Sequence, residues 1–280
     1  MRQSDVMVYL MTGFLDSGKT QFLTFTLEQD YFQIQGKTLL ILCEEGEEEY
    51  DPKEMLKYGV VIEKVEDKED LTEAWLEEMN RKHKPERVVV EYNGMWPVSD
   101  FEKLALPAGW KIEQKIATVD ASTFQMYLTN LKPLFVEMVK GAELVLFNRC
   151  EDRGPLAGYR RSVKVVSPQA EVIFEDENGE VDNIFEDEVP YDLNAPVIEI
   201  RREDYGIWYV DMMDNPDRYD GVTVRYKAVM CHSKKYPGIH CPGRFVMTCC
   251  ENDIQFMGLI AKGMNLNQYQ NQIGRASCRE

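Results

Sequence analysis

The sequence predicts an α/β fold in which a doubly wound, mostly parallel sheet is followed by a small C-terminal β domain. Two observations predict the sheet: strand-like and helix-like segments alternate from residue 6 to about residue 175, and a glycine-rich loop follows the first strand. A third predicts the second domain, because strand-like segments separated by turn residues follow Pro196. We expect a first domain over residues 1–190 and a second over 197–272, joined by an acidic segment that contains Pro190.

The glycine-rich loop lies between a strand-like segment, residues 6–12, and a helix-like segment, residues 21–28. Its sequence, Gly13-Phe14-Leu15-Asp16-Ser17-Gly18-Lys19-Thr20, fits the pattern G-x-x-x-x-G-K-[ST], in which backbone N–H groups surround a phosphate. An eight-residue pattern of this kind also arises by chance, as a glycine turn before an amphipathic helix. Here it has the strand–loop–helix context that phosphate binding requires. We therefore expect a P-loop NTPase-type fold that binds a nucleotide.

Each fixed position of that pattern requires its residue type for a chemical reason. Gly13 and Gly18 let the backbone approach an anion and adopt positive φ. Lys19 reaches the β- and γ-phosphates, and the Thr20 hydroxyl is a ligand of Mg²⁺. The dipole of the following helix adds to the phosphate affinity. The residues that we expect to bind the nucleotide here are Gly13, Asp16, Ser17, Gly18, Lys19 and Thr20.

The composition excludes several classes of protein. The chain has 280 residues and a net charge of −17, which argues against a nucleic-acid partner because phosphate backbones are bound by a surplus of Lys and Arg. No apolar run approaches the roughly 20 residues of a membrane helix, and the N-terminus lacks the pattern of a signal peptide. Seven cysteines without framework-like spacing suit a reducing compartment, so we expect a cytoplasmic protein.

Two acidic features follow the loop. Residues 43–51 carry a run of carboxylates, which either faces a metal or points into solvent; charge runs are usually solvated, so we favour solvent. The apolar strand 87–91 ends in Glu91, with Gly94 three positions later. In phosphate-loop proteins such an acid holds or orients Mg²⁺ and its waters, and such a glycine offers an N–H to the terminal phosphate. The alternative is an ordinary strand end with a turn glycine.

The remaining segments of the first domain fit alternating strands and helices. Leu71, Trp75, Leu76 and Met79 share one face of a predicted amphipathic helix over residues 68–82. Ligands of such sheets bind at the carboxyl ends of the strands, where the acidic features and the glycine-rich loop all lie. The other predicted elements are strands 37–42, 115–122 and 143–148 and a helical stretch over 124–140.

These segments resemble the CobW-type GTPases, relatives of the UreG and HypB metal-insertion GTPases. The resemblance is carried by residues 13–20, 43–51, 88–94, 119–121 and 148–151. It implies a Mg²⁺-dependent GTPase linked to metal homeostasis, with GTP and Mg²⁺ as cofactors and a metal-requiring client protein as partner. Lys19 and Glu91 would then be the catalytic residues, with Thr20 and Glu91 at the Mg²⁺ and Gly94 sensing the γ-phosphate.

The run Asn148-Arg149-Cys150-Glu151 looks like a variant of that family's Asn-Lys-x-Asp guanine reader. A carboxylate there accepts two N–H bonds from guanine, the asparagine contacts the base and the cation covers the ring. Arg149 and Glu151 keep the charges but change reach and planarity, and Asp152 could serve in place of Glu151. The alternative for Asn148 is a turn residue after a strand. CobW-type proteins also carry a Cys-x-Cys-Cys metal motif between the loop and the second acidic strand, and here that interval holds only Cys43.

The second region has a different chemistry. We expect strands at 205–213, 221–230, 244–250 and 254–261, in a domain that resembles the small OB-like β domain of permease-associated proteins. Thiolate and imidazole groups are typical zinc ligands, so one interpretation is a Zn²⁺ site. Adjacent strand residues point to opposite faces, so at most one member of each pair ligates easily. Buried free cysteines and a loop histidine are the alternative. The candidate zinc ligands are Cys231, His240, Cys241, Cys249 and Cys250.

Residues 273–280 look foreign to the protein, and we expect a non-native tail there. The leading functional hypothesis is a GTP-binding and GTP-hydrolysing switch. The alternative from another class is a zinc-binding adaptor whose nucleotide site is regulatory or vestigial. A small-molecule kinase is disfavoured, because the sequence has no evident acceptor site or Arg-rich lid.

Overall fold

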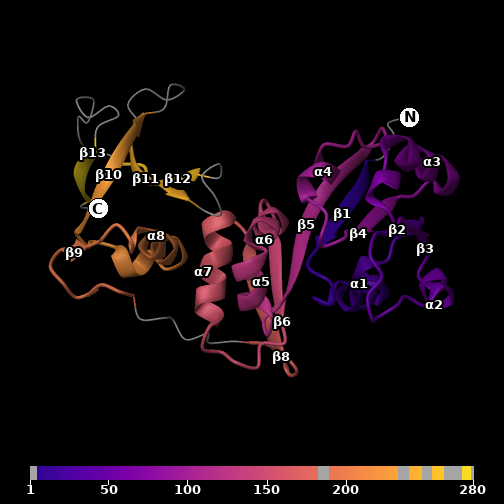
Figure 1. Cartoon of the computed structure of the whole chain (residues 1–280), viewed down its shortest axis with the longest axis horizontal. Helices are drawn as coiled ribbons and strands as arrows, with labels where there is room; N and C mark the ends of the chain where they lie inside the picture. The colour runs from indigo at the N-terminus through magenta and orange to yellow at the C-terminus, as the bar shows by residue number, and fades with distance from the viewer. Residues whose placement is uncertain (1–4, 182–188, 233–239, 248–253, 262–272, 279–280) are drawn as a thin grey trace. The chain divides into compact units, whose positions relative to one another are not determined.

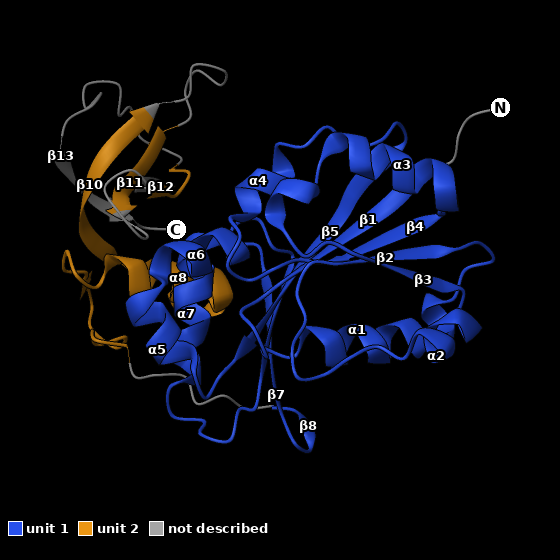
Figure 2. Cartoon of the chain, turned by 45° about the vertical axis from the view of Figure 1, so that its right-hand side comes forward, with its two compact units in different colours: residues 1–185 blue, residues 186–280 orange. Residues whose placement is uncertain are grey.

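The structure is a computed structural model that describes residues 5–181, 189–232, 240–247, 254–261 and 273–278. The chain divides into two compact units, residues 1–185 and 186–280, which Figure 2 distinguishes by colour. Each unit has its own sheet. In the part of the chain that the structure describes, no helix is long and apolar enough to cross a membrane.

The first unit is built on an eight-stranded sheet of order β3-β2-β4-β1-β5-β6-β7-β8. Figure 1 shows β2, β4, β1 and β5 of this sheet side by side. Every pairing is parallel except that of β7 with β8. The chain starts in the middle of the sheet at β1, builds one side through β2, β3 and β4, and then builds the other side from β5, which confirms the predicted doubly wound fold. The strands are β1 (Val6–Thr12), β2 (Thr38–Leu42), β3 (Val60–Lys64), β4 (Arg87–Glu91), β5 (Trp110–Asp120), β6 (Leu144–Asn148), β7 (Glu171–Asp176) and β8 (Gly179–Glu180).

Helices cover both faces of this sheet, as the continuous apolar strands require. Figure 2 shows α1 and α2 on one face and α3 and α4 on the other. Among the strands between them, all residues of β2 and of β4 are buried. The helices of the unit are α1 (Lys19–Glu28), α2 (Pro52–Lys57), α3 (Glu73–His83), α4 (Val98–Glu102), α5 (Phe124–Asn130), α6 (Lys132–Val139) and α7 (Leu156–Val166).

Two predicted helices differ from the structure in their bounds. The amphipathic helix expected from residue 68 begins at Glu73, because the Thr72 side chain accepts a hydrogen bond from the Trp75 N–H at 3.2 Å and caps the first turn. The helical stretch expected over 124–140 is divided into α5 and α6 at Leu131. Pro133 follows in the first turn of α6, where its missing N–H costs nothing.

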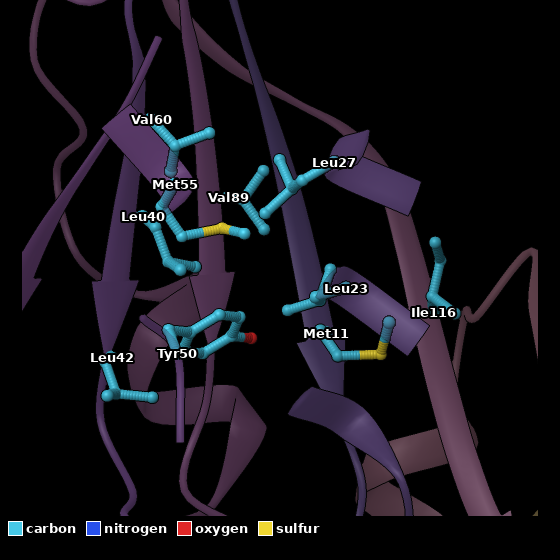
Figure 3. Packing of buried hydrophobic residues seen from close by; sticks show 10 residues of the cluster. All are labelled: Met11, Leu23, Leu27, Leu40, Leu42, Tyr50, Met55, Val60, Val89 and Ile116. Carbon is cyan, nitrogen blue, oxygen red and sulfur yellow. The ribbon is translucent and has the colours of Figure 1, made fainter. Parts of the chain in front are cut away.

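Under α1 and α2, side chains of these helices and of the strands pack in one hydrophobic cluster. Figure 3 shows the ring of Tyr50 within this cluster, so a residue of the acidic segment is part of the core. The cluster holds β-strand and helix side chains in close-packed contact. Its buried members are Met11, Leu23, Leu27, Leu40, Leu42, Tyr50, Met55, Val60, Val89 and Ile116.

The second unit contains a five-stranded sheet in which β12, β11, β10 and β13 are neighbours in that order and β9 pairs with β10. It confirms the predicted small C-terminal β domain. The segment 273–278, expected to be a foreign tail, forms β13 and pairs antiparallel with β10; its foreign origin stays a prediction. The strands are β9 (Ile198–Glu199), β10 (Val224–His232), β11 (His240–Met247), β12 (Ile254–Gly258) and β13 (Ile273–Cys278).

The prediction of a strand over 205–213 is wrong, because this segment is helix α8 (Tyr205–Asp214). Its aromatic and β-branched residues favour a strand by propensity, which context overrides. Tyr205 and Trp208 lie one turn apart and pack on Tyr226 of β10, with ring centroids 5.3 and 4.9 Å from the Tyr226 ring. The backbone N–H of Trp208 donates to the carbonyl of Asp204 at 2.9 Å, which is the first hydrogen bond of the helical pattern.

Candidate functional site

Polar side chains from four separate stretches of sequence meet at one edge of the first sheet. Because β1, β2, β4 and β6 are all linked in one parallel sheet, their carboxyl ends lie at the same edge. Lys19 follows β1, Glu44 follows β2, Glu91 ends β4 and Asn148 ends β6. This edge is where ligands of doubly wound sheets bind.

The loop after β1 has a backbone that only glycine adopts easily. Gly13 has φ +147° and Gly18 has φ +89°. A Cβ at Gly13 would lie 2.4 Å from Ser17 Oγ and 2.6 Å from the Thr118 carbonyl oxygen, and one at Gly18 would lie 2.4 Å from Asn148 Nδ2. The loop is therefore held close to β5 and β6 at both glycines.

The ammonium group of Lys19 lies inside this loop. Its side chain is 3% exposed, and Nζ donates to the carbonyl oxygens of Gly13 at 2.9 Å and Phe14 at 2.8 Å. A third bond, at 2.6 Å, goes to Glu44 Oε2. Two carbonyl oxygens of the loop thus hold the ammonium group of the lysine that, in a phosphate-binding loop, reaches the phosphates.

The acidic segment after β2 is only partly solvated. The Glu44 side chain is 9% exposed and pairs with Lys19, so the expectation that this segment points into solvent is wrong for Glu44. The expectation is confirmed for Glu45 and for residues 47–49, which are exposed. Asp51 lies outside the site, since its carboxylate caps α2 by accepting from the Lys53 N–H at 2.8 Å.

Glu91 lies beside Thr20 and is 2% exposed. The Thr20 hydroxyl donates to Glu91 Oε1 at 2.9 Å, and the Tyr50 hydroxyl donates to Glu91 Oε2. Burial raises the pKa of Glu91, while the two hydroxyl donors and Lys19 oppose that rise. The structure therefore brings together the carboxylate and the hydroxyl that the sequence assigned to Mg²⁺.

Tyr50 is a site residue that the sequence reasoning missed. Burial, followed by the charge of Glu91, raises its pKa well above its usual range, so the phenol stays a hydrogen-bond donor. Its ring is in the core cluster and its hydroxyl is on Glu91. The sequence signal that could have found Tyr50 is an aromatic residue within a run of carboxylates, since a solvated charge run does not require a ring.

Gly94 lies against the start of the loop. A Cβ there would lie 2.3 Å from the Gly13 carbonyl oxygen and 2.7 Å from Phe14 Cα, both backbone atoms. The preceding Asn93 ties this turn to the end of β2, because its Nδ2 donates to the Cys43 carbonyl at 3.3 Å. Any larger residue at position 94 would displace the loop.

Asn148 and Arg149 also contact the loop. Asn148 Nδ2 donates to the Ser17 carbonyl at 2.8 Å, and its Oδ1 is buried with no partner among the described residues. Arg149 Nη1 donates to the Asp16 carbonyl at 2.9 Å and to Asp120 Oδ2 at 2.6 Å. Burial would raise the pKa of Asp120, but the hydrogen bonds from Ser122 and Arg149 hold it below its usual value.

Some predicted nucleotide-binding side chains do not face a common centre. The Ser17 hydroxyl bonds to the Thr118 hydroxyl at 2.9 Å, so this side chain faces β5. Asp16, with φ +58°, accepts the Glu47 N–H at 3.3 Å. Glu151 and Asp152 are exposed on the loop after β6. Sequence reasoning gave Thr118 and Asp120 no role in the site, and the fold brings both to this loop.

The site contains a cavity of about 70 Å³. Hard oxygen donors such as the Thr20 hydroxyl and the Glu91 carboxylate suit Mg²⁺, which keeps several waters and takes few protein ligands. The adjoining ammonium suits an anion. The cavity is lined by Leu15, Asp16, Gly18, Lys19, Thr20, Glu44, Gly46, Glu47, Glu48, Glu91 and Arg149.

The candidate zinc ligands lie in the second unit. Cys231 of β10 is the register partner of Cys241 of β11, so the two thiols share one face. His240 precedes Cys241 on the strand, and its side chain therefore points to the other face. Cys249 and Cys250 lie outside the described residues. Within the described ranges, no group of three His, Cys, Asp or Glu residues could hold a metal ion.

Comparisons with known proteins agree with this architecture. A family model described as CobW/HypB/UreG, nucleotide-binding domain, matches residues 7–174, and one described as DUF1980 C-terminal domain matches residues 177–273. No curated protein matches the sequence.

Two solved structures are similar at low sequence identity. The hydrogenase maturation factor HypB from Archaeoglobus fulgidus is 19% identical, with 62% of this chain and 82% of that chain covered and a TM-score of 0.43. The Zn(II)-bound YjiA GTPase from E. coli is 17% identical, with 98% and 93% covered and a TM-score of 0.49. Since the family model spans more than half of the chain, the protein belongs to the CobW/HypB/UreG nucleotide-binding domain family.

Proposed function

We propose that the protein is a Mg²⁺-dependent GTPase that acts as a conformational switch. One observation carries the proposal: the Lys19 ammonium lies inside the loop Gly13–Thr20, next to the hydrogen-bonded pair of Thr20 and Glu91. This arrangement unites a cation for phosphates with oxygen donors for a divalent metal. Membership of the family supports nucleotide binding.

The phosphates would be held by Lys19 and by the backbone at the start of α1. The first N–H groups of a helix have no partner within the helix, and its dipole favours an anion there. Because α1 begins at Lys19, these N–H groups and the ammonium serve the same phosphate group. Lys19 is the residue with the largest expected share of the binding free energy.

Thr20 and Glu91 are the residues that would hold Mg²⁺ and its water ligands. When bound, Mg²⁺ supplies charge neutralisation at the transferring phosphate. Glu91 is kept in place by the Thr20 and Tyr50 hydroxyls, so its carboxylate has a defined orientation toward the cavity. Gly94, packed on the Gly13 carbonyl, has an N–H next to the loop and is proposed to sense the γ-phosphate.

The base would be recognised at the loop after β6. Asn148 links this loop to Ser17 and retains a buried acceptor, Oδ1, without a partner in the described structure. Arg149 lies across the Asp16 carbonyl, where its guanidinium can cover a base. Glu151 or Asp152 supplies the carboxylate for guanine. Residues 148–152 thus support the part of the proposal that concerns a preference for guanine.

The biological role that we propose is in metal homeostasis, with a metal-requiring client protein as partner. The family includes HypB and UreG by its description, which supports such a role. We also propose a cytoplasmic location and no nucleic-acid partner, in keeping with the net charge of −17.

Side-by-side titration by calorimetry tests the proposal. The full-length protein is titrated with GTP, GDP and ATP, each with and without Mg²⁺, and Lys19→Ala is compared with Lys57→Ala, which removes an exposed lysine of α2. We expect guanine nucleotides to bind, Lys19→Ala to lose at least about a hundredfold in affinity, and Lys57→Ala to behave as wild type. Absence of binding to every nucleotide would end the proposal.

A second candidate function is metal binding by the second unit, as in a zinc-binding adaptor. The observation that favours it is the cross-strand pair of Cys231 and Cys241. Two thiolates on one face supply half of a tetrahedral zinc site. Metal analysis of the purified protein, compared with a Cys231→Ser/Cys241→Ser variant and a Cys150→Ser control, tests it. Stoichiometric zinc that is lost in the double variant alone, without nucleotide turnover, would favour the adaptor.

A further inference from the structure

The phosphate-binding lysine already holds a carboxylate from its own chain. Lys19 Nζ and Glu44 Oε2 are 2.6 Å apart, and the two side chains are 3% and 9% exposed. A charge-assisted bond of this length between enclosed groups is strong. Glu44 thus contacts the same ammonium that a nucleotide phosphate needs.

The segment that carries Glu44 also covers the loop. Glu44, Gly46, Glu47 and Glu48 line the cavity at Lys19, whose volume is about 70 Å³. Ligand pockets for small molecules usually measure about 300–1,000 Å³. The Glu44 side chain therefore occupies part of the space at Lys19 that a phosphate would take.

Contacts near the two ends of the segment show which part can move. At one end the Cys43 N–H donates to the Glu91 carbonyl at 2.9 Å, and at the other the Tyr50 hydroxyl bonds to the Glu91 carboxylate. Between them the cover is held by the Glu44 bond to Lys19 and by two contacts at the surface. These are the Glu47 N–H on Asp16 Oδ1 at 3.3 Å and the exposed ion pair of Glu45 with Lys64, a kind of pair that contributes little to stability. Residues 44–49 form a strap whose ends are anchored in buried contacts, and the bond of Glu44 with Lys19 is the buried contact of its middle.

We propose that Glu44 is a built-in competitor for the nucleotide, and that an incoming phosphate replaces its carboxylate on Lys19 and thereby lifts residues 44–49 from the loop. This inference rests on the proposed nucleotide binding at Lys19. Opening first and binding afterwards would leave a buried ammonium without its carboxylate, which is costly. A direct exchange of one anion for another avoids that cost, and the released strap reports that the site is occupied.

The neighbouring residue provides a matched control. Glu45 has the same charge, but its carboxylate is on Lys64 and more than half exposed. Glu44→Gln keeps the size of the side chain and removes the charge that competes with phosphate. Calorimetric titration with GDP and GTP then compares wild type, Glu44→Gln and Glu45→Gln in the full-length protein. We expect Glu44→Gln to bind about tenfold tighter than wild type and Glu45→Gln to stay within about twofold.

A second variant separates reach from charge. Glu44→Asp keeps the carboxylate but shortens it by one methylene, so it should pair less well with Lys19 and bind nucleotide more tightly than wild type. Equal affinities of wild type, Glu44→Gln and Glu44→Asp would overturn the competition while leaving nucleotide binding intact. An equal gain in Glu45→Gln would also overturn it, since the effect would then be general electrostatics. Absence of binding in wild type and in all variants would overturn both this inference and the proposed function.

Discussion

Reactive side chains are gathered in different ways in the two units. In the first unit, Lys19, Glu44 and Glu91 are far apart in sequence but meet because their parallel strands end at one edge. In the second, Cys231, His240 and Cys241 are close in sequence and lie on two antiparallel neighbours, yet His240 points away from the thiols. Parallel topology collects distant residues at one edge, whereas the alternation of side chains along a strand separates adjacent residues.

The difference shows where substitutions should have far-reaching effects. A residue at the convergent edge of the first sheet contacts several elements at once, so its replacement should alter both chemistry and packing. A residue of the second unit with open space around it should affect its own element alone.

The largest effect is expected for Glu91→Gln. The amide keeps the size of the side chain and can still accept a hydrogen bond from one of the two hydroxyls, Thr20 or Tyr50, through its oxygen. It loses the charge that would order the metal shell. We expect single-turnover GTP hydrolysis to fall about a hundredfold or more, with GDP binding in the absence of Mg²⁺ within about threefold of wild type. An unchanged hydrolysis rate would show that Glu91 has no role in hydrolysis, although it lies at the same edge as Lys19 and Thr20.

Gly94→Ala should disturb the packing of two loops. The new Cβ would meet the Gly13 carbonyl oxygen at 2.3 Å, and neither backbone can yield alone. We expect a loss of about 2–3 kcal/mol in the free energy of unfolding, measured by urea titration of the first unit. A stability equal to that of wild type would mean that the loop is not held where the structure has it.

The pH dependence of stability should report the burial of Glu91. Its pKa is raised in the folded state, so the folded protein binds this proton more tightly than the unfolded chain. The protonated Glu91 therefore adds to the free energy of unfolding. This contribution is fully present at pH values below the pKa of Glu91 in the unfolded chain, and it is lost as the pH rises through the pKa of Glu91 in the folded protein. Each unit of the rise corresponds to about 1.4 kcal/mol. We expect the free energy of unfolding of wild type to fall relative to that of Glu91→Gln as the pH rises through this range, as measured by urea titration. A difference between the two proteins that does not change with pH would contradict the prediction.

The smallest effect is expected for Gly206→Ala in α8. A Cβ there meets nothing within 4 Å, and the position is helical, so alanine should stabilise the second unit by about 0.5–1 kcal/mol. The urea midpoint of that unit measures it. A destabilisation would show that α8 is more crowded at this position than the structure has it, and the contrast with Gly94 would weaken.

The sequence predicted what local patterns determine. The strand–loop–helix around Lys19 and the acidic strand end at Glu91 follow from spacing and chemistry, whereas the close packing of Gly94 on Gly13 is seen only in the fold. The contact of Glu44 with Lys19 could not be predicted, because a run of carboxylates is normally solvated and nothing local marks one of them as enclosed. The hydrogen bond of Tyr50 depends likewise on where α2 packs.

The errors in the second unit have a related cause. The segment beginning at Tyr205 has the composition of a strand, and only its packing on Tyr226 selects a helix. The thiol pair of Cys231 and Cys241 depends on register, which the sequence of either strand does not contain. Long-range contacts therefore decided the features that pattern reasoning missed.

The double attachment of Tyr50 has a mechanical consequence. Its hydroxyl is on Glu91, its ring packs in the same cluster as Met55, and the next residue, Asp51, caps α2. A shift of the phenol cannot be absorbed locally, since close-packed interiors transmit displacement. A displacement of that hydroxyl from the carboxylate is therefore expected to reach α2, through the ring of Tyr50 and the cap at Asp51.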